Sequence, residues 1–182
     1  MIERVNAFAV TGGPGAGKTA LLRHLAAMGH ACVEESARAV LRAEAAAGRG
    51  RPATARFCEL MLARDVAAFH AAGAELTFFD RSIVDAWATF RVDGLAPSPA
   101  AEEAVRTLRY NPTAFIAPPW RAIYVTDAER IQTWDQAVAS YEGCARAYED
   151  AGYALVELPR TGVESRAAFV LEVTTKRGAP TA

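Results

Sequence analysis

The sequence has little lysine, no excess of either charge and no long apolar run. Only two of its 20 basic residues are lysine, Lys18 and Lys176. The 20 basic and 21 acidic residues leave a net charge of −1, so electrostatics gives no general means of binding nucleic acid or an anionic membrane. No uncharged apolar run approaches the roughly 18–20 residues of a membrane span, and the first residues lack the pattern of a signal peptide. Neither nucleic acid nor a membrane is therefore expected as a partner.

Cysteine and histidine are also scarce, with three of each. The cysteines are far apart in the sequence and form no C-x-x-C pair, so neither a disulfide framework nor a zinc site is predicted. Unpaired cysteines are typical of a reducing compartment, and we expect a cytoplasmic protein. The oligomeric state is left open by the sequence.

The chain is long enough for one domain, and its 52% hydrophobic residues allow a sizeable core. Short apolar segments alternate with helical ones. Strands are predicted at 5–11, 31–34, 75–80, 113–117 and 153–158, and helices at 18–28, 36–47, 54–72, 83–90, 100–109 and 163–173, with a further long helix from a capping box at Thr126 and Glu129 to Gly152. Five buried strands separated by helices favour an α/β fold of three layers, in which helices cover both faces of a five-stranded parallel sheet. We predict a single domain over 1–175 and a frayed tail over 176–182.

A glycine-rich segment follows the first predicted strand and opens the first predicted helix. It satisfies the pattern G-x-x-x-x-G-K-[ST], in which backbone N–H groups and a helix N-terminus surround a phosphate. We predict that this loop, a P-loop, binds ATP. Its residues are Gly12, Gly13, Pro14, Gly15, Ala16, Gly17, Lys18 and Thr19. The alternative is a chance match, which at average composition occurs in about one chain of this length in a hundred.

The last two residues of the loop are predicted to act directly on the nucleotide. Lys18 reaches the β- and γ-phosphates as a catalytic residue, and the hydroxyl of Thr19 holds Mg²⁺. A lysine at position 18 is informative because the chain uses arginine at 18 of its 20 basic positions. A planar guanidinium is bulkier than an ammonium and would not fit the phosphate loop in the same way.

An acid and a cation end the third predicted strand. Asp80 is predicted to hold Mg²⁺, and the alternative is an ordinary N-cap of the following helix. Arg81 stands where many ATP hydrolases have glutamate, and we predict that it neutralises the transferred phosphoryl group, as in P-loop kinases of nucleosides and nucleotides. The chain has neither an N-K-x-D box nor an LSGGQ segment, which disfavours translation-type GTPases and ABC-type ATPases.

A second pair of acids, Glu34 and Glu35, follows the second predicted strand. In a parallel sheet, groups at the carboxyl ends of strands face the ligand crevice. Glu35 is predicted to take the proton from an acceptor hydroxyl, and Arg38 to bind an anionic part of the acceptor. The alternative for Glu35 is a solvated helix start, where an acid suits the helix dipole.

Arg130 lies in the predicted first turn of the long helix, where a cation opposes the macrodipole. An anionic partner would remove this mismatch, so we predict that Arg130 belongs to a lid that closes over the phosphates, with Arg121 nearby. A plain surface arginine is the alternative. The three tryptophans are expected to pack in the core or the lid. For Trp120, stacking on a nucleotide base is kept as an alternative.

These segments resemble a family of small bacterial AAA-type P-loop ATPase domains. That family is related to the kinase domain that phosphorylates ribosylnicotinamide in a bifunctional nicotinamide-nucleotide regulator. The matching segments are GGPGAGKT at 12–19, EESAR at 34–38, FFDRSIVDA at 78–86, DAER at 127–130 and the stretch from ELP at 157–159 to VESR at 163–166. The resemblance implies a kinase-type strand order, binding of Mg-ATP and the lid role of Arg130. The chain departs from the pattern at Ser82, where a smaller turn residue is expected.

These patterns predict an Mg-ATP-dependent phosphotransferase of the nucleoside or nucleotide kinase type, acting on a small hydroxyl-bearing acceptor. The catalytic residues are predicted to be Lys18, Glu35, Arg81 and Arg130, and the acceptor contacts Arg38, Asp85 and Arg121. The main alternative is an ATP-dependent switch or slow ATPase that acts on a protein partner. A structural domain with a vestigial loop is a further alternative.

Overall fold

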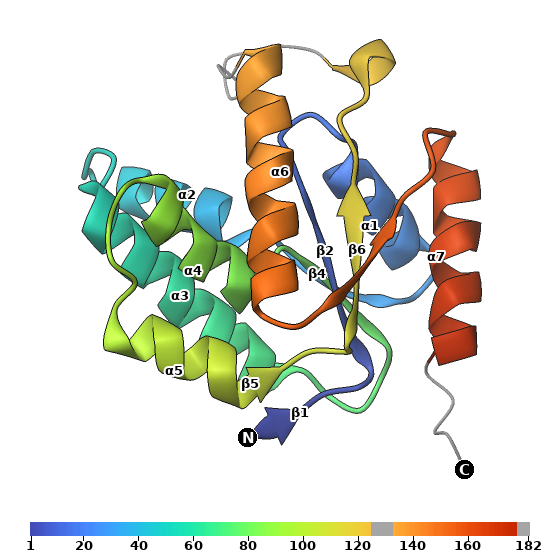
Figure 1. Cartoon of the computed structure of the whole chain (residues 1–182), viewed down its shortest axis with the longest axis horizontal. Coiled ribbons are helices and arrows are strands. Elements are labelled where there is room, and N and C mark those ends of the chain that lie inside the picture. Colours follow the sequence, from blue (N-terminus) through green and yellow to red (C-terminus); the bar gives the residue numbers. More distant parts are fainter. Residues whose placement is uncertain (125–132, 178–182) are drawn as a thin grey trace.

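The computed structural model describes residues 1–124 and 133–177. Figure 1 shows the order of the elements along the chain. They are β1 (Ile2–Glu3), β2 (Ala7–Gly12), α1 (Lys18–Ala27), β3 (Ala31–Val33), α2 (Ser36–Ala46), α3 (Thr54–Ala71), β4 (Thr77–Asp80), α4 (Ile83–Val92), α5 (Pro99–Thr107), β5 (Leu108–Arg109), β6 (Thr113–Ala117), the 3₁₀ helix η1 (Arg121–Ile123), α6 (Trp134–Asp150), β7 (Ala154–Glu157) and α7 (Val163–Arg177).

The main sheet consists of five parallel strands in the order β3-β4-β2-β6-β7. The central strand β2 is buried along its whole length. Its register pairs Val10 with Asp80 of β4 and with Phe115 of β6. The predicted α/β fold with a five-stranded parallel sheet is confirmed, and the strand order is the kinase-type order that the resemblance implied.

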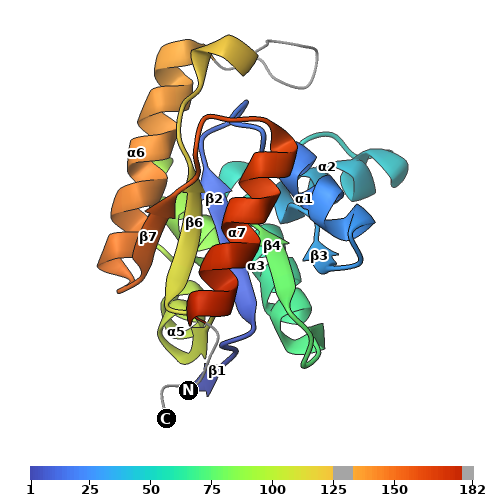
Figure 2. The same cartoon turned by 90° about the vertical axis from the view of Figure 1, so that its right-hand side faces the viewer.

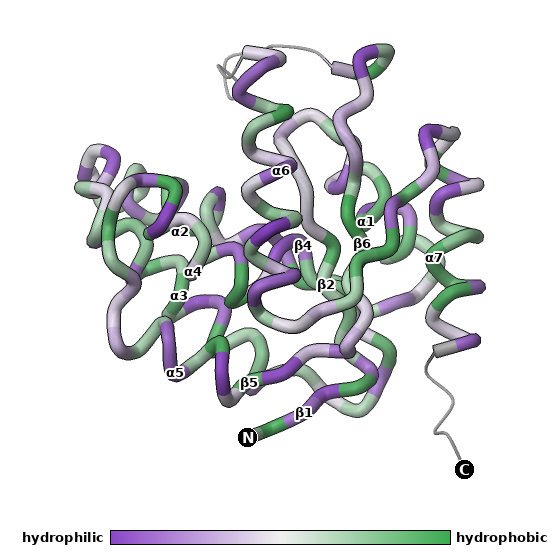
Figure 3. The backbone as a smooth tube through the Cα atoms, in the orientation of Figure 1, coloured by the Kyte–Doolittle hydropathy of each residue, from purple (hydrophilic) through white to green (hydrophobic). Residues whose placement is uncertain are grey.

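Helices cover both faces of this sheet, and the alternation of side chains along β2 explains how. Ala7 and Ala9 pack with α3, α4 and α6, while Phe8 and Val10 pack with α1 and α7, because successive side chains of a strand point to opposite faces. Figure 2 shows α7 in front of the sheet and α3 behind it. Figure 3 shows hydrophobic and hydrophilic residues alternating along the turns of α6 and α7, as in helices that bury one side.

The structure differs from the sequence predictions at several element ends. Leu108 and Arg109, predicted as the end of a helix, form strand β5, which pairs with β1 in a separate two-stranded sheet. Helix α6 begins at Trp134, where Thr133 and Gln136 form a capping box; the predicted capping box of Thr126 and Glu129 lies outside the described residues. Helix α7 continues to Arg177, past its predicted end and into the predicted tail.

The parallel arrangement brings the carboxyl ends of β2, β3 and β4 to one edge of the sheet. The glycine-rich loop follows β2, the acids Glu34 and Glu35 follow β3, and Asp80 ends β4. This edge is therefore where the predicted site residues meet. Within the described part of the chain, no helix has the length and apolar character needed to cross a membrane.

Candidate active site

The glycine-rich loop between β2 and α1 has a backbone that needs glycine at specific positions. Gly12, Gly15 and Gly17 have φ angles of 121°, 74° and 80°, which side-chain-bearing residues rarely adopt. A Cβ atom at Gly12 would lie 2.4 Å from the carbonyl oxygen of Ala117, and one at Gly17 would lie 2.6 Å from Nη1 of Arg166. Close packing against β6 and α7 thus fixes the path of the loop.

The side chain of Lys18 is buried in this loop. Its Nζ donates hydrogen bonds to the carbonyl oxygens of Gly12 and Gly13, at 2.9 and 2.7 Å. Burial and, less strongly, the charge of Arg81 lower the pKa of Lys18 to about 8, against the opposite effect of nearby carboxylates. The folded protein therefore holds a destabilised cation inside the loop, and an anion bound there would relieve this cost.

Thr19 and Asp80 lie beside Lys18. The hydroxyl of Thr19 donates a hydrogen bond of 3.3 Å to Oδ2 of Asp80, while Oδ1 of Asp80 is buried and has no hydrogen-bond partner among residues 1–124 and 133–177. Burial raises the pKa of Asp80, against the lowering effect of the Lys18 charge. The N-cap of α4 is Ser82, so the alternative reading of Asp80 as a helix cap is wrong. A buried carboxylate with an unsatisfied oxygen next to a hydroxyl matches the oxygen ligands that Mg²⁺ takes.

Glu35 lies between two guanidinium groups. Its Oε1 accepts a hydrogen bond of 2.9 Å from Nε of Arg81, and its Oε2 lies 3.0 Å from Nε of Arg38. Its side chain is 17% exposed and makes no capping hydrogen bond to α2, which contradicts the alternative of a solvated helix start. Burial acts to raise the pKa of Glu35, but the charges of Arg81 and Lys18 outweigh it and the pKa is lowered. Glu35 is thus an ionised carboxylate at neutral pH.

Arg81 holds its position through an unusual backbone conformation and a second carboxylate. Its φ of 71° lies in the left-handed region, where a side-chain-bearing residue costs of order 1–3 kcal/mol. Its Nη1 donates to Oδ1 of Asp85 at 3.0 Å. Arg81 therefore connects Glu35, at the end of β3, with Asp85, in the first turn of α4.

Asp85 is the centre of a buried hydrogen-bond network and not an acceptor contact as predicted. Its side chain is only 3% exposed, and it does not line the cavity described below. Oδ1 also accepts from the hydroxyl of Thr11, and Oδ2 accepts from the backbone N–H of Ser82 and the hydroxyl of Tyr148, each at 2.6–2.9 Å. Both oxygens of Asp85 accept hydrogen bonds from protein donors, so this carboxylate does not contact the acceptor.

Tyr148 and Ser82 complete this network. The Tyr148 hydroxyl donates its proton to Asp85, so it accepts from Oγ of Ser82 at 2.6 Å. Ser82 is fully buried and caps α4. The departure from the family pattern at Ser82 therefore affects the support of Arg81 and not the wall of the cavity. Sequence reasoning missed Tyr148, whose spacing on α6 indicated only a core-facing position.

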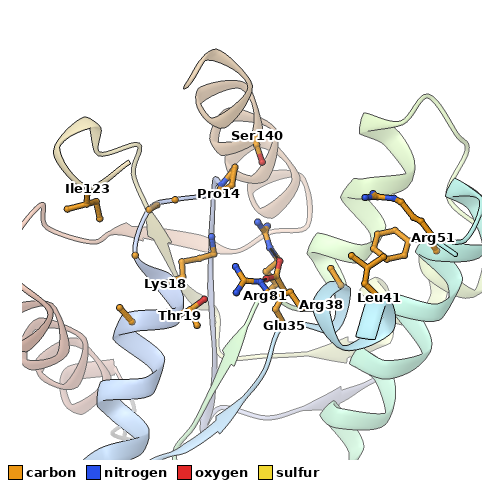
Figure 4. A pocket seen from close by; sticks show the side chains of 16 residues that line it. Pro14, Lys18, Thr19, Glu35, Arg38, Leu41, Arg51, Arg81, Ile123 and Ser140 are labelled. Atoms are coloured by element: carbon orange, nitrogen blue, oxygen red, sulfur yellow. Dashed lines mark hydrogen bonds and ion pairs between the residues drawn. The ribbon is translucent and has the colours of Figure 1, made fainter. Parts of the chain in front are cut away.

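A cavity of about 440 Å³ opens along this edge of the sheet. Figure 4 shows Lys18 and Thr19 at one side, Glu35, Arg38 and Arg81 in the middle, and Leu41 and Arg51 at the other side. Ile123 of η1 and Ser140 of α6 also line it. The wall residues are Pro14, Gly15, Ala16, Gly17, Lys18, Thr19, Ala20, Glu35, Ala37, Arg38, Leu41, Arg51, Phe57, Arg81, Ile123 and Ser140. The structure thus brings together residues from the loop, α2, α3 and the end of β4.

Arg121, one of the predicted arginines, does not join this cluster. Arg121 is exposed in η1, and its guanidinium carbon lies 4.8 Å from the ring centroid of Trp134. Arg130 lies outside the described residues, so its role in a lid stays a prediction. Trp87 of α4 is buried in the core, and Trp120 is half-buried and does not line the cavity.

The strand order and the glycine-rich loop after the central strand define a P-loop protein with a kinase-like fold. A family model described as an AAA domain matches residues 7–166. The chain therefore belongs to this AAA domain family, and the resemblance drawn from the sequence segments is confirmed. The sequence comparison with curated proteins found no match.

Solved structures of P-loop kinases share this fold. The NadR protein in complex with NR superposes with a TM-score of 0.67 at 19% identity, over 94% of this chain and 51% of that one, so the chain spans about half the length of NadR. Deoxyadenosine kinase from M. mycoides, with dCMP and dCDP bound, superposes with a TM-score of 0.66 at 9% identity, over 93% of this chain and 98% of that one. Shikimate kinase from Acinetobacter baumannii, in complex with shikimate, superposes with a TM-score of 0.54 at 12% identity, over 95% of this chain and 94% of that one.

Proposed function

We propose that this protein is an Mg-ATP-dependent phosphotransferase that acts on a small hydroxyl-bearing acceptor. One observation carries the proposal. The ionised carboxylate of Glu35 and the phosphate-loop residue Lys18 line the same cavity of about 440 Å³. A protein that only bound or slowly hydrolysed ATP would not need a cavity that continues past the loop to a carboxylate and two arginines.

Each residue of the cluster has a role in the proposed reaction. The acceptor hydroxyl oxygen forms a bond to the γ-phosphorus of ATP, and the bond from that phosphorus to the β,γ-bridging oxygen breaks, with the electron pair leaving on ADP. The hydroxyl proton passes to Glu35, whose oxygens keep lone pairs besides those that accept from Arg81 and Arg38. Lys18 binds the β- and γ-phosphates, and Arg81 neutralises the transferred group.

Thr19 and Asp80 would hold Mg²⁺ in this reaction. Their fit to the ion rests on the unpartnered Oδ1 of Asp80 and the neighbouring Thr19 hydroxyl, 3.3 Å from Oδ2. When bound with ATP, the ion supplies neutralisation of charge on the β- and γ-phosphates. The positions of Arg130 as a lid residue and of Arg121 as an acceptor contact stay predictions, as does the division into one domain and a tail.

The proposal is tested by measuring ADP release with and without small acceptors. Nucleosides, nucleoside monophosphates and cyclic hydroxy acids are offered in pools with Mg-ATP. We expect ADP release to depend on at least one pool and to be lost in Lys18→Ala, while the matched variant Lys176→Ala behaves as wild type, because Lys176 lies on the exposed side of α7 beside Glu172. Thermal unfolding with Mg and a non-hydrolysable ATP analogue checks nucleotide binding separately. Saturation at about 100 times Kd adds roughly 2.7 kcal/mol of stability.

The alternative function, an ATP-dependent switch acting on a protein partner, gives a different result in the same assay. ADP release would then be slow and independent of every pool. A wild-type protein that shows no thermal shift with the ATP analogue would contradict both functions.

A further inference from the structure

The half of the cavity far from the P-loop has residues for which the reaction above gives no role. Ala37 and Leu41 of α2, Phe57 of α3 and Arg51, in the loop between these helices, form its wall. Figure 4 shows Leu41 and Arg51 on the side of Glu35 and Arg38 that faces away from Lys18. In the proposed reaction the nucleotide phosphates lie against the loop, so this half is left for the body of the acceptor.

The wall of this half combines apolar side chains with a guanidinium. The guanidinium carbon of Arg51 lies 5.1 Å from the ring centroid of Phe57, in a cation–π contact. Leu41 and Ala37 extend the apolar surface beside it. This combination suits a ring compound that packs against the side chains while one of its polar groups reaches a cation.

The charges of this region do not balance. Three guanidinium groups, those of Arg38, Arg51 and Arg81, line the cavity. Of the nearby carboxylates, Glu35 and Asp85 both bind Arg81, Glu35 also binds Arg38, and Asp80 lies beside the Lys18 cation. Over residues 1–124 and 133–177, Arg51 has no ion pair with a carboxylate, so the unbalanced positive charge lies on it. Arg51 is exposed, so water solvates its charge in the free protein and the guanidinium is available to an anionic group of the acceptor.

We propose that the acceptor is a ring compound that carries a phosphate or carboxylate group in addition to the reacting hydroxyl. Arg51 binds the anionic group with help from Arg38, the ring packs against Phe57 and Leu41, and the hydroxyl points to Glu35. This inference rests on the proposed function, and it excludes neutral and cationic nucleosides as the preferred acceptors.

The test compares binding of matched probes that differ in charge. Isothermal titration calorimetry of the full chain, with Mg and a non-hydrolysable ATP analogue present, uses uridine against uridine 5′-monophosphate and a cyclic polyhydroxy carboxylate against its amide. A cationic pyridinium riboside completes the panel. The first pair measures what a phosphate group adds to binding, and the second pair measures what a carboxylate adds. We expect at least one anionic probe to bind at least about 10-fold more tightly than its neutral partner, because it adds a hydrogen bond between charged groups.

Variants then assign the preference to Arg51. Arg51→Gln should raise the Kd of the anionic probe by about 10-fold and leave the Kd of the ATP analogue within about 2-fold of wild type. The matched control Arg106→Gln, an exposed arginine of α5 paired with Glu103, should change neither. Equal or tighter binding of the neutral or cationic probes, no binding of any anionic probe, or an Arg51→Gln variant that binds like wild type overturns the inference. These outcomes leave the proposed function standing as long as the ATP analogue itself binds, and loss of analogue binding in the wild type contradicts the function instead.

Discussion

Replacing Lys18 by methionine tests whether the phosphate loop holds a destabilised cation. The pKa of Lys18 falls from 10.5 to about 8 in the folded protein, which corresponds to roughly 3 kcal/mol of unfavourable free energy when the amine is charged in both states. Below pH 8 the folded and unfolded chains are both protonated at Lys18, and the whole cost applies. Between pH 8 and 10.5 the unfolded chain binds the proton and the folded chain does not, so stability rises with pH.

The magnitude follows from the same two pKa values. About 2 kcal/mol of the roughly 3 kcal/mol is recovered between pH 7 and pH 9.5. We therefore expect the difference in unfolding free energy, wild type minus Lys18→Met, to increase by about this amount over that range. Methionine has a similar length and no charge. The difference between the two proteins cancels the titration of other groups, such as Cys32, whose pKa burial raises to about 11.

The assay is urea unfolding of both proteins, without nucleotide, at several pH values between 7 and 9.5. Lys176→Met serves as the control, since Lys176 is exposed and paired with Glu172, and its difference from wild type should not vary with pH. A flat difference for Lys18→Met would refute the reasoning that burial destabilises the Lys18 cation. Nucleotide binding gives a second readout: the phosphates favour the charged amine, so binding of Mg-ATP at pH 8.5 should take up protons, and Lys18→Met should lose this uptake.

Two further substitutions address the metal residues and the support of Arg81. Asp80→Asn keeps the shape but removes the charge that would hold Mg²⁺, so we expect Mg-dependent turnover to fall by orders of magnitude with little loss of stability in the absence of nucleotide; strong destabilisation with unchanged turnover would show a structural role. Tyr148→Phe removes the hydroxyl that donates to Asp85 at 2.6 Å, which should cost about 1–3 kcal/mol in urea unfolding. If Asp85 positions Arg81, kcat should fall while KM for ATP stays near wild type, and unchanged kcat would mean that the network serves stability alone.

Local patterns were sufficient to predict most of the fold. β6 has the predicted bounds, 113–117, because its five residues are all buried between β2 and β7 and read as one apolar run. The helices α1 and α6 end close to Gly29 and Gly152, as predicted, and both glycines have a positive φ. In contrast, β1 and β5 are two residues long and pair across more than 100 positions, and such a short pair leaves no periodic signal in the sequence.

The sequence predicted those parts of the candidate site that lie within one continuous segment. The loop from Gly12 to Thr19 and the acid at Asp80 follow from a motif and a strand end. Tyr148 and Phe57 come from two predicted helices, and their contacts could not be predicted because these depend on how the helices pack on the sheet. Arg166, whose Nη1 donates to the carbonyl oxygen of Ala16 at 2.9 Å, lies in the VESR segment that carried the resemblance, and the sequence assigned it no role.

Three local costs fall at the same edge of the sheet. Lys18 is a buried cation with a lowered pKa, Asp80 has a buried oxygen without a hydrogen-bond partner in the part of the chain that the structure describes, and Arg81 has a left-handed backbone. Each would be removed by a simple substitution if stability were the only requirement, and departures of this kind concentrate at functional sites. An anion bound in the loop relieves the first cost and a cation at Asp80 relieves the second. Mg-ATP supplies both, which is why these costs support one ligand at this edge better than three unrelated defects.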